Sequence, residues 1–89
     1  MNYYNKLVKI VIQILEDTEI GKKTTATTLS KKTNTTYCHT NNVIKLLEKN
    51  NLISRKQEGR KILITIIDKE FFNSVKGFYN LFKNKGVFN

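Results

Sequence analysis

The most constraining feature of this sequence is a helical pattern in the middle of the chain, from Thr36 to Ile53. Four residues at helical spacing would form its buried side: Thr40, Val43, Ile44 and Leu47. The other positions carry amides, a hydroxyl, an imidazole and an ammonium, with no acidic group before Glu48. Because such groups can bond base edges or phosphates, the pattern predicts a helix whose outer face suits nucleic acid.

A second helical segment precedes this one, and two extended segments follow it. Residues 24–33 fit a short helix that Thr24 or Thr25 can cap. Its inward residues would be Ala26, Leu29, Ser30 and Thr33. Residues 54–67 read as two strands that turn at Glu58 and Gly59. This order of helix, turn, helix and basic hairpin predicts a winged helix-turn-helix: a mainly α fold with a small β-hairpin wing.

The stretch LSKKTNTTYCHTNNVIKLLEKNNLISRKQEGRKILITI resembles the DNA-binding core of small winged-helix transcription regulators of the MarR-like and ArsR-like kind. The similarity is highest in LLEKNNLISR, which leads into the wing. Asn51 stands where the family usually has glycine, and asparagine tolerates the left-handed conformation that ends a helix. Three residues depart from the family's usual apolar pattern: Thr33, Thr35 and Thr40.

Length and charge limit the kind of protein this is. A chain of 89 residues has room for a single domain, residues 1–89, with a small core. Its formal net charge is +9, from 16 Lys and Arg against 7 Asp and Glu. Ten of the basic residues lie between Lys22 and Lys61, against two acids. A lysine-rich surface can simply keep a protein soluble, but charge that coincides with the proposed binding core favours nucleic acid.

Both ends of the chain predict helices with much apolar surface. In residues 1–17 the expected core stripe is Tyr4, Leu7, Val8, Val11, Ile14 and Leu15, with Tyr3, Ile10 and Ile12 outside it. Beyond this helix, Ile20 could add a short third strand to the wing. In residues 68–85, Asp68 can cap a helix whose stripe is Phe71, Val75, Phe78 and Phe82, flanked by Phe72 and Tyr79. Such surface needs cover from the other terminal helix or from another subunit.

The terminal helices lead to a prediction of a homodimer. In regulators of the resembled family, the first and last helices commonly build a two-fold dimer. The expected contacts are Tyr3, Tyr4, Phe71, Phe72, Phe78, Tyr79 and Phe82. The alternative is that these rings complete the core of one protomer.

A homodimer would place two copies of the helix at 36–51 in successive major grooves, about 34 Å apart, where they read an inverted repeat. The groove residues would be Tyr37, His39, Asn41, Asn42 and Lys45. Asn41 and Asn42 are the candidate base readers, because a carboxamide can pair bidentately with adenine. The expected phosphate contacts are Thr25, Lys31, Lys32 and Thr36. The expected wing contacts are Arg55, Lys56, Arg60 and Lys61, at the minor groove or the backbone.

Other chemistries find little support in the sequence. One cysteine, Cys38, excludes an internal disulfide and fits a reducing cytoplasm. Cys38 could be a redox switch or a small filler. With His39 the only histidine, a zinc site lacks ligands. The sequence has no glycine-rich phosphate loop and no Ser-His-Asp set, so neither an enzyme nor a cofactor is expected. Lys9 and Gln13 interrupt the N-terminal apolar run, so no membrane span is expected.

The sequence therefore predicts a cytoplasmic transcription regulator that binds double-stranded DNA as a homodimer and acts as a repressor by occluding promoters. The long extra helices that form ligand pockets in larger MarR-type proteins are lacking, so a small-molecule effector is not expected. The alternative is a winged-helix module that binds RNA or a protein partner in a replication or transcription assembly.

Overall fold

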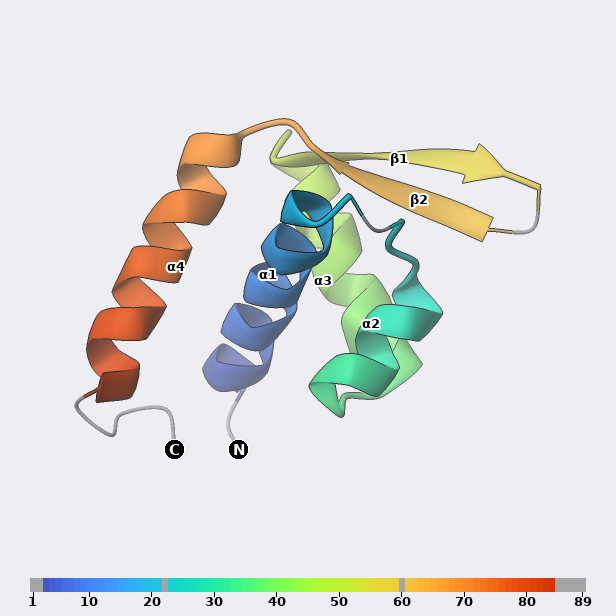
Figure 1. The fold of residues 1–89 in the computed structure, drawn as a ribbon. Coiled ribbons are helices and arrows are strands. Elements are labelled where there is room, and N and C mark those ends of the chain that lie inside the picture. Colours follow the sequence, from blue (N-terminus) through green and yellow to red (C-terminus); the bar gives the residue numbers. More distant parts are fainter. Residues whose placement is uncertain (1–2, 22, 60, 85–89) are drawn as a thin grey trace.

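The computed structural model describes the backbone of residues 3–21, 23–59 and 61–84, and the side chains of residues 6–21, 23–59 and 63–84. Within these ranges the chain forms a mainly helical fold with one antiparallel hairpin (Figure 1). The elements are α1 (Tyr3–Glu19), α2 (Ala26–Thr33), α3 (Tyr37–Lys49), β1 (Ile53–Glu58), β2 (Lys61–Ile66) and α4 (Lys69–Asn84). No helix within the described ranges is long and apolar enough to span a membrane.

Helix α1 is the centre of the fold, because it contacts α2, α3, α4 and β2. This position explains how Ile10 and Ile12, which lie off the predicted stripe and were expected to need cover from the last helix or another subunit, are buried. Ile10 is fully buried and Ile12 is 8% exposed. A helix surrounded on several sides can bury more than one apolar stripe, so the extra cover comes from the protomer itself. The helix ends at Glu19, two residues beyond the predicted end, and Gly21 follows with a φ of 72°.

Helices α2 and α3 begin and end on polar side chains. Thr25 caps α2, since its hydroxyl accepts a hydrogen bond from the Thr28 backbone N–H, and Thr36 caps α3 by accepting from the His39 N–H. Asn34 ends α2 with a φ of 55°. The predicted inward side of α3, formed by Thr40, Val43, Ile44 and Leu47, is buried.

The end of α3 leads directly into the hairpin. Asn51 has a φ of 60°, which is the left-handed conformation expected for it. Its N–H donates to the Glu48 carbonyl and the Leu52 N–H donates to the Leu47 carbonyl, and these two bonds close the helix end. Strands β1 and β2 then pair from Ile53 opposite Ile66 to Glu58 opposite Lys61.

The predicted third strand at Ile20 is wrong. The described sheet has two strands, and Ile20 lies in a turn with 74% of its surface exposed. Its N–H donates to the Glu16 carbonyl at the end of α1, so the chain here follows the helix end instead of the β2 edge.

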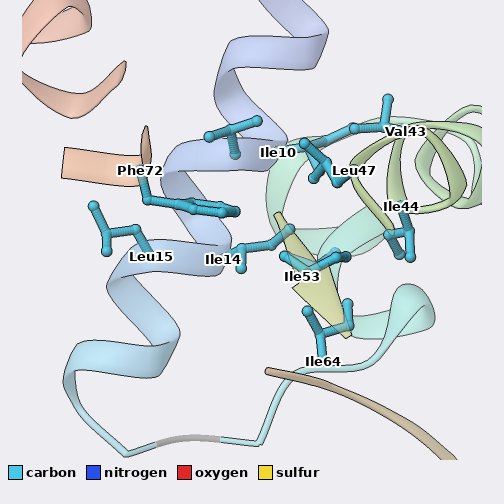
Figure 2. Packing of buried hydrophobic residues seen from close by; sticks show 11 residues of the cluster. Ile10, Ile14, Leu15, Val43, Ile44, Leu47, Ile53, Ile64 and Phe72 are labelled. Carbon is cyan, nitrogen blue, oxygen red and sulfur yellow. The ribbon is translucent and has the colours of Figure 1, made fainter. Parts of the chain in front are cut away.

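The hydrophobic core joins all the helices to the hairpin. It consists of Ile10, Val11, Ile14, Leu15, Leu29, Val43, Ile44, Leu47, Ile53, Ile64 and Phe72. Figure 2 shows the Phe72 ring entering this cluster from α4, beside Ile14 and Leu15. The start of α4 is fixed by Asp68, whose carboxylate accepts from the Phe71 N–H at 3.0 Å.

The inward face of α4 is shifted from its predicted aromatic stripe. Phe71 and Val75 of that stripe pack against the core, but the residue that enters the core is Phe72. Phe72 is the one fully buried residue among those described in α4, whereas Phe71 and Val75 are half-buried and Phe78 is 48% exposed. Phe72 was also expected to contact a partner subunit. Because its ring is enclosed in the protomer core, Phe72 is removed from the set of candidate dimer contacts.

Candidate nucleic-acid interface

The outward side of α3 is polar and basic. Cys38, Asn42, Lys45 and Lys49 recur at intervals of three or four residues, so they share one side of the helix, and all four are exposed. This side lies opposite the buried Val43 and Leu47. It therefore offers one carboxamide, two ammonium groups and a thiol to a molecule that approaches α3 from outside.

The other residues expected in a DNA groove lie on the flanks of α3. Tyr37 is 54% exposed, while His39 and Asn41 are half-buried. Asn41 lines a small cavity together with Arg55 and Ile64 of the hairpin. Of the two candidate base readers, Asn42 is thus the more accessible, and Asn41 lies where α3 meets the hairpin strands.

An ion pair connects the middle of the hairpin to the end of α3. Arg55 donates from both Nε (3.0 Å) and Nη2 (2.7 Å) to the same oxygen of Glu48. The hydrogen bond from Arg55 lowers the pKa of Glu48, and the bond to Glu48 raises the pKa of Arg55. The carboxylate of α3 is therefore compensated, and the guanidinium that was expected to contact DNA has a protein partner.

The four expected phosphate contacts divide into two groups. Thr25 and Thr36 are helix caps, and Thr25 also bonds the Thr28 hydroxyl at 3.0 Å. Lys31 is exposed on α2. Lys32 instead reaches back to α1, where its Nζ lies 2.9 Å from the buried Asp17 carboxylate. Among the four expected phosphate contacts, Lys31 and the first turn of α3 therefore remain accessible to DNA.

The β1–β2 hairpin has one exposed lysine among its described side chains. Lys56 is exposed on β1, and Lys23 in the loop before α2 lies 3.3 Å from Glu58 near the hairpin tip. Both members of this second pair are mostly exposed, so it adds little stability. Arg60 and the side chain of Lys61, which were expected to contact DNA, lie outside the described residues, as do the side chains of the expected dimer contacts Tyr3 and Tyr4.

The sequence prediction did not include Lys49 among the candidate interface residues. Its spacing of seven residues from Asn42 and four from Lys45 was the available signal, because these intervals return to the same side of a helix. Lys49 extends the basic outward side of α3 towards the hairpin.

Comparison with known proteins shows a similarity of fold but gives no information on function. No protein-family model matches the sequence, and no curated protein matches it. Among solved structures, the chain is similar to the crystal structure of AF1382 from Archaeoglobus fulgidus, with a TM-score of 0.80 and 20% sequence identity. The similarity covers 86% of this chain and 87% of the archaeal one. At this identity the likeness concerns the fold alone.

Proposed function

We propose that this chain is a winged helix-turn-helix protein that binds double-stranded DNA sequence-specifically, with α3 in the major groove and the β1–β2 hairpin as the wing. The observation that carries the proposal is the outward side of α3. Asn42, Lys45 and Lys49 are exposed there, while Glu48, the one carboxylate of α3, is bonded by Arg55. A carboxamide followed by two ammonium groups on one side of the helix supplies both a base reader and phosphate contacts.

The individual roles follow from accessibility. Asn42 is the base reader in this proposal, with Tyr37 and Asn41 beside it at the edge of the groove. Lys45, Lys49 and the wing residue Lys56 neutralise phosphates, because an exposed ammonium on a flexible stem acts as a point charge. Lys31 and the capped N-terminus of α3 hold the backbone on the other side.

The protein acts as a homodimer in this proposal, and the surface between α1 and α4 supports that part of it. An apolar groove of about 410 Å³ is lined by Leu7, Val8, Val11, Phe71, Ser74, Val75 and Phe78. Phe78 is 48% and Leu81 57% exposed, and Phe82 packs on Phe78 with ring centroids 4.4 Å apart. A second copy would cover these side chains, which water otherwise contacts.

A two-fold dimer determines the form of the target. Two α3 helices would enter successive major grooves about 34 Å apart, so the proposed site is an inverted repeat. Occupation of such a site within a promoter would exclude polymerase, so the proposed outcome is repression.

Selection of bound duplexes from a random pool, with the full chain at physiological salt, tests the function. The expected result is an enriched inverted repeat whose half-sites lie about 10 base pairs apart. Binding should weaken steeply with salt, because each neutralised phosphate releases counterions. A pool without an enriched sequence, or preference for A-form RNA over every DNA duplex, would overturn the proposal.

A further inference from the structure

A second basic region lies away from the proposed DNA interface. It is a hollow of about 350 Å³ between α1, α4 and the end of α2, and α3 and the hairpin contribute none of its described lining residues. The lining residues that matter here are Lys9, Glu16, Lys32, Asn34, Tyr79 and Lys83. Its volume lies within the usual range for small-ligand sites.

Charge is distributed unevenly along this hollow. Figure 1 shows that α1 and α4 run in opposite directions, and the Lys76–Glu19 ion pair, at 3.6 Å, sets their relative register. Lys83 lies two turns beyond Lys76, about 10 Å along the axis, in the direction of Lys9. Glu16 lies about the same distance from Lys9 on α1. One end of the hollow is therefore cationic, and the other carries a carboxylate.

The end of α2 lines part of the hollow, and its groups add no uncompensated negative charge that would repel an anionic ligand. The carbonyl groups of Lys31 and Ser30 already accept hydrogen bonds from the N–H groups of Asn34 and Thr35. Lys32 Nζ stays beside the buried carboxylate of Asp17 and balances its charge. Lys9 and Lys83 thus remain to attract a ligand, against Glu16, the one carboxylate among the described lining residues.

An aromatic ring lies near the carboxylate end of this hollow. Tyr79 is half-buried one helical turn before Lys83, whose Nζ is 5.8 Å from the ring centroid. By the same register, Tyr79 lies near the level of Glu16. A planar base beside this ring would direct its amino group to a carboxylate acceptor, while its phosphate would lie at the cationic end.

We propose that this hollow binds a purine mononucleotide, with the phosphate at Lys9 and Lys83, the base beside Tyr79, and the exocyclic amino group towards Glu16. Lysine binds phosphate as a point charge, and an aromatic ring accepts a base by its flat face. The site is independent of the proposed DNA function, since it uses no residue of the outward side of α3.

Titration of the ¹⁵N-labelled full chain with AMP at low salt, followed by amide chemical shifts, tests the proposal. The expected shifts are at Lys9, Gln13, Asn34 and Tyr79, with a dissociation constant of about 1 mM or below. Ribose 5-phosphate, which lacks the base, should bind about 10-fold more weakly because the stacking contact is lost. The double variant Lys9→Gln, Lys83→Gln should weaken AMP binding by about 10-fold or more.

A matched control separates this site from the proposed DNA surface. Lys45→Gln, Lys56→Gln removes the same charge from α3 and β1, and it should leave the AMP affinity unchanged. Unchanged amide shifts of the core would show that both variants are folded. Shifts confined to α3 and the hairpin, equal losses in the two double variants, or ribose 5-phosphate binding as tightly as AMP would each overturn the proposal.

Discussion

The Oγ1 atoms of Thr35 and Thr40 lie 2.6 Å apart, so a hydroxyl in the connection between α2 and α3 bonds directly to the buried side of α3. Thr33 extends this series of hydrogen bonds, since its hydroxyl lies 2.9 Å from that of Thr35 and donates to the Leu29 carbonyl at 2.7 Å. These are the three positions where the resembled family usually has apolar residues. Hydrogen bonding satisfies the buried hydroxyls and links the end of α2, through the connection, to α3.

Replacement of Thr40 by valine should destabilise the protein. Valine keeps the shape of threonine but removes the hydroxyl, so Thr35 loses a partner in a site where Thr40 is fully buried. The expected loss in the free energy of unfolding is about 1–2 kcal/mol, measured by urea denaturation. Thr27→Val on the exposed side of α2 is the control and should change it by less than about 0.5 kcal/mol. Equal stability of Thr40→Val and the parent would show that the hydrogen bonds between these threonines do not stabilise the fold.

Lys32 should matter more for stability than its exposed neighbour Lys31. Its ammonium is the counter-charge of Asp17, whose side chain is only 2% exposed and also accepts from Gln13 and Thr24. Lys32→Met would leave that carboxylate buried without a cation. The side chain of Lys32 is itself 29% exposed, so the expected cost is about 2 kcal/mol, below that of a fully enclosed pair. In urea denaturation Lys31→Met should lie close to the parent, and equal effects of both substitutions would refute the assignment.

The buried residues of a helix could be predicted from the sequence where only one face of that helix is covered by the rest of the fold. The stripe of α3 is such a case, because apolar residues recurred with the helical period. Ile10 and Ile12 could not be placed this way, because their burial depends on α1 having neighbours on several sides. The same holds for α4: its aromatic periodicity indicated a helix but not the direction from which α1 approaches, so Phe72 was assigned outside the main stripe although it is the ring that enters the core.

The ion pair between Glu48 and Arg55 predicts a pH dependence of stability. Arg55 lowers the pKa of Glu48 in the folded protein. The ionised carboxylate therefore stabilises the fold at pH values above the pKa that Glu48 has in the unfolded chain. This contribution is lost as the pH falls through the lower pKa that Glu48 has in the folded protein. Glu48→Gln should be less stable than the parent near neutral pH. The two should converge as the pH falls below about 4, near the ordinary pKa of glutamate. Urea denaturation at a series of pH values measures this, and a difference that persists in strong acid would exclude the pair as its cause.

Pairings between distant side chains explain why the candidate site was only partly predicted. Asn42 and Lys45 lie outward as expected, because the helical period determined their side. Arg55 was assigned to DNA because it is a basic residue in a basic hairpin. Only the turn at Asn51 brings its guanidinium back to Glu48, and composition carries no signal of that return. Lys32 was diverted to Asp17 for the same reason, since the packing of α2 on α1 brings them together.

Substitutions on α3 and on the hairpin should affect the proposed DNA binding in different ways. Asn42→Ala should reduce discrimination at one base pair by about 1–3 kcal/mol, because a carboxamide reads a base edge. Lys56→Gln should weaken all duplexes alike and reduce the slope of log affinity against log salt by about 0.9, the value for one phosphate contact. Fluorescence anisotropy on the selected repeat and on single-base variants of it separates the two effects. Equal losses on every duplex for both variants would contradict the assigned roles.

Two phenylalanines of α4 should separate dimerisation from folding. Phe78 lines the apolar groove between α1 and α4 and is 48% exposed, whereas Phe72 is fully buried. Phe78→Glu should therefore give a monomer by light scattering at tens of micromolar with little change in helix content, because a carboxylate would have to be desolvated in the interface. Phe72→Leu should lower the free energy of unfolding by about 1–2 kcal/mol, less than removal of the whole ring, and the folded fraction should remain dimeric. A parent protein that is already monomeric at this concentration would exclude the dimer, and the inverted repeat would then lose its structural basis.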